Sequence, residues 1–278
     1  MCGNSNSLKE IEKPMKKILL SKIPDGMPCE IRRFAAAADI YDSSSSPEAA
    51  VYFIDKGSGY YLKRSGKGTL AKECKMTEYF HAKGFGAEVL SYVCAADDWL
   101  LTAAVSGKDC TCEKYLTEPK RLCDTIAAGL RNLHETDFDA CPVPDRMAEY
   151  FAAAGENYRA GKFDPSLFSG FSGDFCFRSA REAYEGFTVG KAALQSRVLL
   201  HGDYCLPNII LNDWKLSGFV DVGFGGVGDR HIDLFWGVWT LCFNLKTDRY
   251  CGRFLDAYGR DRADESLLRI IAAAETFG

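Results

Sequence analysis

Two carboxylates and one amide in the C-terminal half of the chain have the types and spacing of a site for a hard cation. Asp203 lies in the segment HGDYCLPN, which ends with Asn208, and Asp221 follows thirteen residues later in the sequence DVG. Carboxylate and amide oxygens suit Mg²⁺, which prefers hard oxygen ligands and is commonly shared with substrate phosphates. An oxygen-rich site of this kind predicts magnesium-dependent chemistry on a phosphorylated substrate.

Short strands and a turn must bring these three side chains together. We expect one strand to end at Leu200 and to deliver Asp203 into a loop, and the chain to enter the next strand after Asn208. A hairpin turn at Asn212-Asp213 would then return Asp221 to the side of Asn208. Each of these residues alone would be an ordinary turn residue, because Asp and Asn favour turns. Their order and spacing together favour a site.

The pattern of the first hundred residues predicts a sheet. Residues 50–54 and 60–64 flank the turn-rich sequence DKGSG and predict one hairpin, and residues 88–93 and 99–104 predict a second. A helix is expected between the hairpins, over residues 70–83. Strands that come first and helices that come later are typical of the segregated α+β class.

The remainder of the chain is mainly helical. Thr117 is the expected N-cap of a helix that buries apolar residues at helical spacing from Leu122 to Leu133. We divide the chain into an N-terminal lobe, residues 1–105, and a C-terminal lobe, residues 106–278. Further helices are expected over residues 145–160, 179–184, 232–243, 253–258 and 265–276, and short strands over residues 197–200, 209–211 and 216–221.

The composition is that of an ordinary globular protein. The 278 residues are 47% hydrophobic and 26% charged, which excludes the disordered, collagen-like and coiled-coil classes. This length corresponds to roughly two domains, or to one domain with two lobes. The net charge of −4 argues against a nucleic-acid partner, because such proteins usually carry a strong basic excess.

No stretch of the sequence indicates secretion or a membrane span. The first residues lack the apolar core of a signal peptide, and no run reaches about 18 apolar residues. We therefore expect a cytoplasmic protein whose twelve cysteines are reduced. The spacing of Cys110, Cys112 and Cys123 fits no zinc pattern well. Residues 8–20 have the spacing of an amphipathic helix, but whether they pack on the first lobe stays open.

The segment around Asp203 resembles the catalytic loop of the protein-kinase-like phosphotransferases, which use H-x-D-x4-N followed by D-x-G. More narrowly, HGDYCLPNIILNDWKLSGFVDVGFGGVGDRHIDL resembles the aminoglycoside phosphotransferases, and above all their 3′-hydroxyl group. LHETDFDACP, at residues 133–142, resembles the same group, and so does the region around residues 254–259. The resemblance runs from about residue 50 to the C-terminus. It implies a bilobal protein-kinase-like fold, with a small antiparallel sheet that binds nucleotide and a mainly helical lobe for catalysis and substrate binding.

The resemblance implies that a lysine and a glutamate handle the nucleotide phosphates. Lys63, in the strand sequence YYLKR, would hold the α- and β-phosphates. Glu73, ten residues further on, would orient Lys63 from a helix. Glu78 is the alternative partner on the same helix.

Two backbone segments complete the implied nucleotide site. The serine-containing loop DSSSSP at residues 42–47 would cradle phosphates with its backbone N–H groups, chiefly at Ser45 and Ser46. Backbone groups of Ala103 and Val105, at the connection between the lobes, would bind the adenine ring.

The implied reaction is transfer of the γ-phosphate of ATP or GTP to a substrate hydroxyl. Asp203 would accept or orient the hydroxyl proton, and Asn208 and Asp221 would hold Mg²⁺. Positioning and electrostatics, rather than covalent chemistry, would supply most of the acceleration. His201 would brace the loop, and Asp233 would support it from the start of a helix.

The acceptor is expected among acidic residues, because aminoglycosides are polycations. The resemblance implies substrate contacts at Glu275 and Phe277 near the C-terminus, and at Glu156 and Asp164 in the region of the substrate flap. Where the family typically has two adjacent acids near its end, Glu275 stands alone. Phe224 occupies a position where the family often has arginine.

Two other functions fit the same residues. One is a kinase of the same fold for another hydroxylated metabolite or antibiotic, such as an amino sugar or a choline-like alcohol. The other, from a different class, is a nucleotide-binding pseudokinase-like module, which the intact set of phosphate-, metal- and proton-handling residues disfavours. The stretch between Asp221 and Asp233 is too short for the activation loop of a protein kinase. We expect a monomer or weak dimer that acts on a small molecule, with no nucleic-acid or membrane partner.

Overall fold

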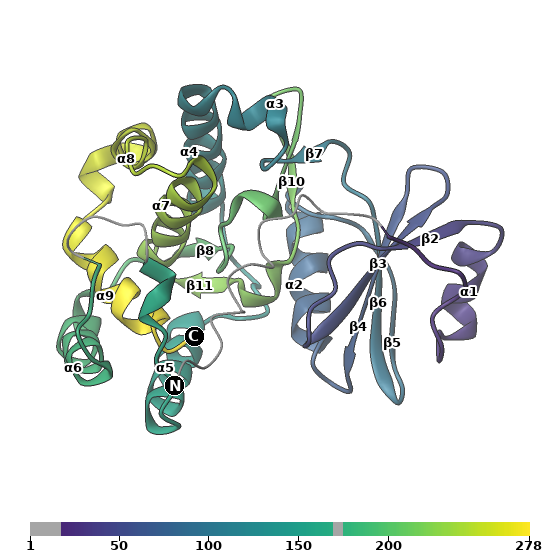
Figure 1. The fold of residues 1–278 in the computed structure, drawn as a ribbon, viewed down its shortest axis with the longest axis horizontal. Coiled ribbons are helices and arrows are strands. Elements are labelled where there is room, and N and C mark those ends of the chain that lie inside the picture. The colour runs from purple at the N-terminus through teal and green to yellow at the C-terminus, as the bar shows by residue number, and fades with distance from the viewer. Residues whose placement is uncertain (1–17, 169–174) are drawn as a thin grey trace, which may run out of the picture. The chain divides into compact units, whose positions relative to one another are not determined.

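The computed structural model describes residues 18–168 and 175–278, which form two compact units. Unit 1 contains the described residues up to Cys74 together with Ala87–Ala104, and unit 2 contains Lys75–Gly86 and Val105–Gly278. The strands of the main sheet lie in unit 1 and most helices lie in unit 2 (Figure 1), as the α+β prediction requires. No helix in the described ranges is both long enough and apolar enough to cross a membrane.

Unit 1 is built on a six-stranded antiparallel sheet in the order β1-β2-β3-β4-β6-β5 (Figure 1). Both predicted hairpins are present, since β3 pairs with β4 and β5 pairs with β6. The strands are β1 (Ile18–Leu19), β2 (Asp39–Asp42), β3 (Ala49–Asp55), β4 (Tyr60–Gly66), β5 (Val89–Cys94) and β6 (Asp97–Ala103), and the helices are α1 (Cys29–Ala35) and the start of α2 (Ala71–Ala82).

The two faces of this sheet have different partners. Leu62 of β4 and Leu101 of β6 are paired across the strands and are fully buried against Ile31 of α1. Successive side chains of a strand point to opposite faces, so Lys63 lies on the other face. There its cross-strand neighbour Leu100 packs with residues at the start of α2. The register of β4 and β6 therefore places Lys63 on the same face as the start of α2.

Unit 2 is a set of helices around one large apolar core, with two small antiparallel sheets. The helix α4 packs against α8, and α9 packs against α6 and α7. The sheets are β10-β9-β7 and β11-β8. Its helices are α3 (Glu113–Leu116), α4 (Pro119–Glu135), α5 (Arg146–Arg159), α6 (Ala180–Gly190), α7 (His231–Leu245), α8 (Cys251–Gly259) and α9 (Glu265–Glu275). Its strands are β7 (Lys108–Asp109), β8 (Val198–Leu200), β9 (Ile209–Asn212), β10 (Lys215–Phe219) and β11 (Gly226–Gly228). Short 3-10 turns in its described residues are η1 (Pro165–Phe168), η2 (Lys191–Ala193), η3 (Leu206–Asn208), η4 (Val222–Phe224) and η5 (Arg260–Arg262).

The prediction that Thr117 caps α4 is wrong. Thr117 ends the preceding helix α3, because its hydroxyl donates to the carbonyl oxygens of Glu113 and Lys114. The helix α4 begins two residues later at Pro119. Proline suits this place, since its φ is already helical and the first turn needs no N–H donor there.

Two further predictions need correction. The hairpin between β9 and β10 turns at Asp213 and Trp214, one residue later than predicted, and both have positive φ, 47° and 67°. Two such residues are typical of the type I′ turn, whose twist matches that of the strands. Of the amphipathic helix suggested for residues 8–20, residues 8–17 lie outside the described residues, and Ile18–Leu19 form the strand β1.

Candidate active site

Asp203 and Asn208 are joined by hydrogen bonds within the loop that follows β8. Nδ2 of Asn208 donates to Oδ2 of Asp203 at 2.9 Å and to the Asp203 carbonyl oxygen at 3.1 Å. Both of these oxygens are acceptors, so the nitrogen of the amide must face Asp203. The Asn208 Oδ1 oxygen consequently points away from the carboxylate, in the orientation that a cation ligand needs.

Asp233 anchors the start of this loop from the first turn of α7. Its carboxylate is fully buried and accepts hydrogen bonds from the backbone N–H groups of His201 at 2.8 Å and Gly202 at 2.7 Å. Nε2 of His134, on α4, lies 3.0 Å from Asp233 Oδ2. Buried carboxylates are tolerated when they are hydrogen-bonded in this way. The prediction that Asp233 supports the loop from a helix start is confirmed.

His201 ties the same loop to the end of β10. The backbone N–H of Asp203 donates to Nδ1 of His201 at 3.2 Å, so Nδ1 carries a lone pair. The ring must then carry its proton on Nε2, which lies 3.1 Å from the carbonyl oxygen of Val220. Both nitrogens are occupied by the backbone, and the predicted bracing role of His201 is confirmed.

Asp221 comes directly after Val220, whose backbone contacts Asn208. The N–H of Val220 donates to the Asn208 carbonyl oxygen at 3.0 Å, which brings the next residue, Asp221, beside Asn208 as predicted. Asp221 is exposed and has left-handed backbone angles, φ 58° and ψ 49°. Such angles are uncommon for residues other than glycine and often occur at functional sites.

The oxygen donors at this place fit Mg²⁺. Asn208 and Asp221 offer two protein oxygens, and Mg²⁺ characteristically takes only one or two protein ligands and completes its shell with phosphate and water. Within residues 18–168 and 175–278, no three His, Cys, Asp or Glu side chains converge into a closed metal site. An open two-residue site is the kind that shares its metal with a phosphorylated substrate.

Lys63 and Glu73 form the predicted ion pair in unit 1. Nζ of Lys63 lies 3.0 and 2.8 Å from the two carboxylate oxygens of Glu73, in the first turn of α2. The two side chains are only 21% and 13% exposed, so solvent screens this pair less than a surface pair. Glu78 is exposed. The pairing with Glu73 decides between the two alternatives.

The serine loop is a hairpin connection held by its own hydroxyl groups. Oγ of Ser45 accepts the N–H of Val51 at 3.0 Å, and Oγ of Ser46 accepts the N–H groups of Glu48 and Ala49 at 3.3 and 3.2 Å. These bonds fix the loop between β2 and β3. Binding of phosphate by its backbone stays a prediction.

The residues predicted to bind adenine lie where the chain leaves β6. Ala103 ends β6 and donates its N–H to the Glu88 carbonyl oxygen at 2.9 Å, and Val105 is the first residue of the second part of unit 2. The Ala103 N–H is therefore already used within the sheet. Contact with adenine at Ala103 and Val105 stays a prediction.

Glu275 is held by a tyrosine in unit 2. The hydroxyl of Tyr150, on α5, donates to Oε1 of Glu275 at 2.8 Å. Burial raises the pKa of Glu275 to about 7, and the negative charge of Asp203 contributes in the same direction. The hydrogen bond from Tyr150 and the charge of Arg146 partly offset this rise. Glu275 thus shares an electrostatic environment with the predicted catalytic aspartate.

Phe277 does not offer a surface to a substrate. Its side chain is 1% exposed and lies among the rings of Tyr158, Phe163 and Tyr184, at centroid distances of 5.5, 6.0 and 5.9 Å. It anchors the C-terminus in the core, so its prediction as a side-chain contact to substrate finds no support.

The two acids predicted in the flap region are both exposed. Asp164 accepts the N–H of Ser166 at 2.9 Å and donates its own N–H to the carbonyl oxygen of Thr276 at 2.7 Å, which places it beside the residue after Glu275. Glu156 lies on α5. Contact of either acid with a substrate stays a prediction.

Comparison with known proteins decides the family. A sequence model of the phosphotransferase enzyme family matches residues 44–268. A probable aminoglycoside 3′-phosphotransferase of Lactococcus lactis subsp. lactis (strain IL1403) is 44% identical over 273 residues, which cover 98% of this chain and 99% of that protein. The chain belongs to the aminoglycoside phosphotransferase family. As a member it is an O-phosphotransferase, and the family resemblance seen in the sequence is confirmed.

Other aminoglycoside phosphotransferases support the assignment and the fold. An aminoglycoside 3′-phosphotransferase of Niallia circulans is 32% identical over 180 residues, 65% of this chain and 67% of that protein. The crystal structure of a type VIII aminoglycoside 3′-phosphotransferase superposes with a TM-score of 0.70 at 22% identity, over 84% of this chain and 91% of that one. The structure of the aminoglycoside phosphotransferase APH(3″)-Id of Streptomyces rimosus, in complex with ADP and streptomycin, superposes with a TM-score of 0.65 at 25% identity. The match covers 82% of this chain and 90% of that one. The fold prediction is confirmed.

Sequence reasoning missed the partners that hold the phosphotransferase site together. His134 follows Leu130 and Leu133 on the buried face of α4, which indicates burial but not its contact with Asp233. Tyr150 precedes Glu275 by 125 residues, and no local pattern connects the two. Contacts of this kind depend on how helices pack rather than on spacing.

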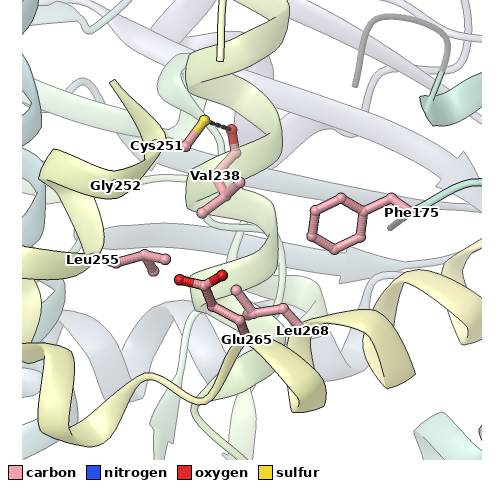
Figure 2. A pocket seen from close by; sticks show the side chains of 7 residues that line it. All are labelled: Phe175, Val238, Cys251, Gly252, Leu255, Glu265 and Leu268. Atoms are coloured by element: carbon pink, nitrogen blue, oxygen red, sulfur yellow. Dashed lines mark hydrogen bonds between the residues drawn. The ribbon is translucent and has the colours of Figure 1, made fainter. Parts of the chain in front are cut away.

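A cavity of about 260 Å³ lies elsewhere in unit 2 and contains none of the predicted site residues. Figure 2 shows that the thiol of Cys251 is turned to the carbonyl oxygen of Val238, 3.7 Å away, while the ring of Phe175 points into the space. Glu265 on its wall is already paired with Arg260 at 2.6 Å. The mainly apolar lining has no converging polar groups, and we assign it no part in the phosphotransferase reaction.

Proposed function

We propose that this enzyme transfers the γ-phosphate of ATP, or of GTP, to the 3′-hydroxyl of an aminoglycoside and thereby confers resistance to the antibiotic. The observation that carries the proposal is the contact between Asp203 and Asn208. The amide nitrogen of Asn208 faces the Asp203 carboxylate, and the amide oxygen of Asn208 points away from it. Relatives named as aminoglycoside 3′-phosphotransferases support the choice of acceptor and hydroxyl.

Asp203 would accept or orient the proton of the acceptor hydroxyl. The hydrogen bond from Asn208 and the bracing by His201 hold the carboxylate in one place, so the attacking oxygen meets a fixed acceptor. Oδ1 of Asn208 and the carboxylate of Asp221 would hold Mg²⁺. When bound, Mg²⁺ would supply positive charge to the phosphate oxygens.

Lys63 would bind the α- and β-phosphates of the nucleotide, and Glu73 would keep its ammonium group in position. Their bidentate contact and low exposure support this role. The backbone at Ser45 and Ser46 would bind phosphate. The complex of a relative with ADP supports nucleotide use.

The acceptor would lie against acidic side chains. Glu275 is electrostatically coupled to Asp203, so a positively charged acceptor bound at Glu275 would bring its hydroxyl groups close to the catalytic aspartate. Asp164 and Glu156 are further candidates for contact with its ammonium groups. We propose that the enzyme is cytoplasmic, because the cytoplasm supplies the nucleotide. We also propose that it is a monomer or a weak dimer.

The test is ADP release with ATP and Mg²⁺ on aminoglycosides that carry a 3′-hydroxyl, such as kanamycin, and on analogues that lack it. The proposal predicts turnover with the first group, little with the second, and none with the Asp203→Ala variant. Turnover that does not depend on the 3′-hydroxyl would contradict the proposed regiochemistry. Nucleotide binding without turnover of any aminoglycoside would indicate a different acceptor.

A further inference from the structure

We propose that Tyr150 is a positioning residue for the acceptor, which holds the Glu275 carboxylate as the receptor for an ammonium group of the substrate. The inference rests on the proposed function, and it adds the side chain that fixes where the acidic group stands. Tyr150 has neither the type nor the spacing of a catalytic motif.

Tyr150 fixes Glu275 from α5. Its hydroxyl lies 2.8 Å from Glu275 Oε1 and 3.5 Å from the carbonyl oxygen of Ile271, one turn earlier on α9. The ring packs near Phe151, with the centroids 6.3 Å apart. A tyrosine held at both its ring and its hydroxyl leaves the carboxylate little freedom.

The negative charge of Glu275 is available to a positively charged ligand. Across the described residues, no lysine, arginine or histidine lies within ion-pair distance of this carboxylate. Arg146, whose positive charge acts on this carboxylate, donates to the carbonyl oxygen of Phe224 at 2.8 Å and pairs with Glu149 at 3.3 Å. A half-buried carboxylate that is hydrogen-bonded but not paired favours a cation.

Groups from three elements act on the ionisation of Glu275. Tyr150 and Arg146 act from α5, Trp236 from α7, and Asp203 from the loop after β8, where the charge of Glu275 in turn raises the pKa of the Cys205 thiol. Because burial and Asp203 raise the pKa to about 7, Glu275 gains its charge near neutral pH. Acceptor binding should therefore strengthen as the pH rises through about 7.

The experiment measures the kinetics of Tyr150→Phe with kanamycin, ATP and Mg²⁺. We expect KM for kanamycin to rise about tenfold in Tyr150→Phe, as for a lost hydrogen bond to a charged group, with kcat and KM for ATP nearly unchanged. The acid limb of kcat/KM should move to higher pH, because the lost bond favoured the ionised carboxylate.

Matched controls separate positioning from general damage. Tyr158, two turns further along α5, stacks on Tyr184 at 3.9 Å, and Tyr158→Phe should leave KM and the pH profile unchanged. In a Glu275→Gln background, which should lose the acid limb, Tyr150→Phe should have little further effect.

Two results would overturn the inference while leaving the proposed function intact. In the first, the wild-type enzyme turns over kanamycin, and the Tyr150→Phe variant has the same KM, kcat and pH profile as the wild type. The other is an equal loss of kcat for every acceptor without a change in pH profile. Absence of aminoglycoside turnover in the wild-type enzyme would instead overturn the proposed function, and this inference with it.

Discussion

Two neighbouring side chains fix the position of Asp203 through hydrogen bonds. Asn208 donates to its carboxylate, and His201 accepts its backbone N–H. The types and spacing of these residues were sufficient to predict them from the sequence, because catalytic loops use short, fixed separations. Glu275 could be proposed from the resemblance alone, but its raised pKa could not, because that depends on burial.

Replacing Asp203 by Asn tests its role at the reacting oxygen. The amide cannot accept the hydroxyl proton, and we expect kcat to fall by about 10²–10⁴, the usual contribution of a positioned general base. Nucleotide affinity should stay within about twofold by calorimetry, since the proposed role of Asp203 is at the acceptor hydroxyl and not at the nucleotide. Asp213→Asn, at an exposed residue of the β9–β10 turn, is the control.

Glu275→Gln tests the ionisation of that carboxylate through stability. The folded-state pKa of about 7 lies above the ordinary value of 4.5, so the stability associated with this group is present at low pH and is lost as the pH rises towards 7. Glutamine removes that loss. We expect thermal or urea unfolding to show the variant about 1–3 kcal/mol more stable than wild type at pH 8, with little difference at pH 4.5. An equal difference at both pH values would contradict the raised pKa.

The predicted residues lie at the ends of their elements. The loop after β8 carries Asp203, the first turn of α7 carries Asp233, and the first turn of α2 carries Glu73. Strands and amphipathic helices could be predicted from their periodicity. The cap of α4 at Thr117 and the β9–β10 turn could not be placed correctly, because competing hydrogen bonds and the strand twist decide them.

Asp233→Asn tests how α7 holds the catalytic loop. An amide can accept through one oxygen, so at least one buried N–H loses its acceptor, and we expect about 2–4 kcal/mol of destabilisation in urea. The loop should also loosen, with a fall in kcat at temperatures where the variant is folded. Asp256→Asn, at an exposed ion pair on α8, should cost less than about 0.5 kcal/mol.

Glu73→Gln tests the contact between β4 and α2. With the ion pair lost, Lys63 is no longer held at its predicted phosphate position, and we expect KM for ATP to rise about tenfold while KM for kanamycin changes little. Glu78→Gln, on the exposed side of the same helix, should behave as wild type. A larger effect at Glu78 would reverse our assignment of the lysine partner.

At the scale of the whole molecule, the predicted residues divide between the two units. Lys63, Glu73 and the serine loop belong to unit 1, and Asp203, Asn208 and Asp221 belong to unit 2. The order of these parts along the chain could be predicted from the family resemblance. The contact of Tyr150 with Glu275 could not, because it joins residues 125 positions apart through helix packing.

The position of the transferred phosphate distinguishes a 3′-phosphotransferase from an enzyme that modifies another hydroxyl. The enzyme would be incubated with kanamycin, ATP and Mg²⁺, and the product examined by ³¹P and ¹H NMR. We expect one phosphate ester, on the 3′-oxygen, and far less product with Asp203→Asn than with the wild-type enzyme over the same short incubation, in line with the expected fall in kcat. A phosphate on another oxygen, or full product formation by Asp203→Asn, would contradict the proposed function.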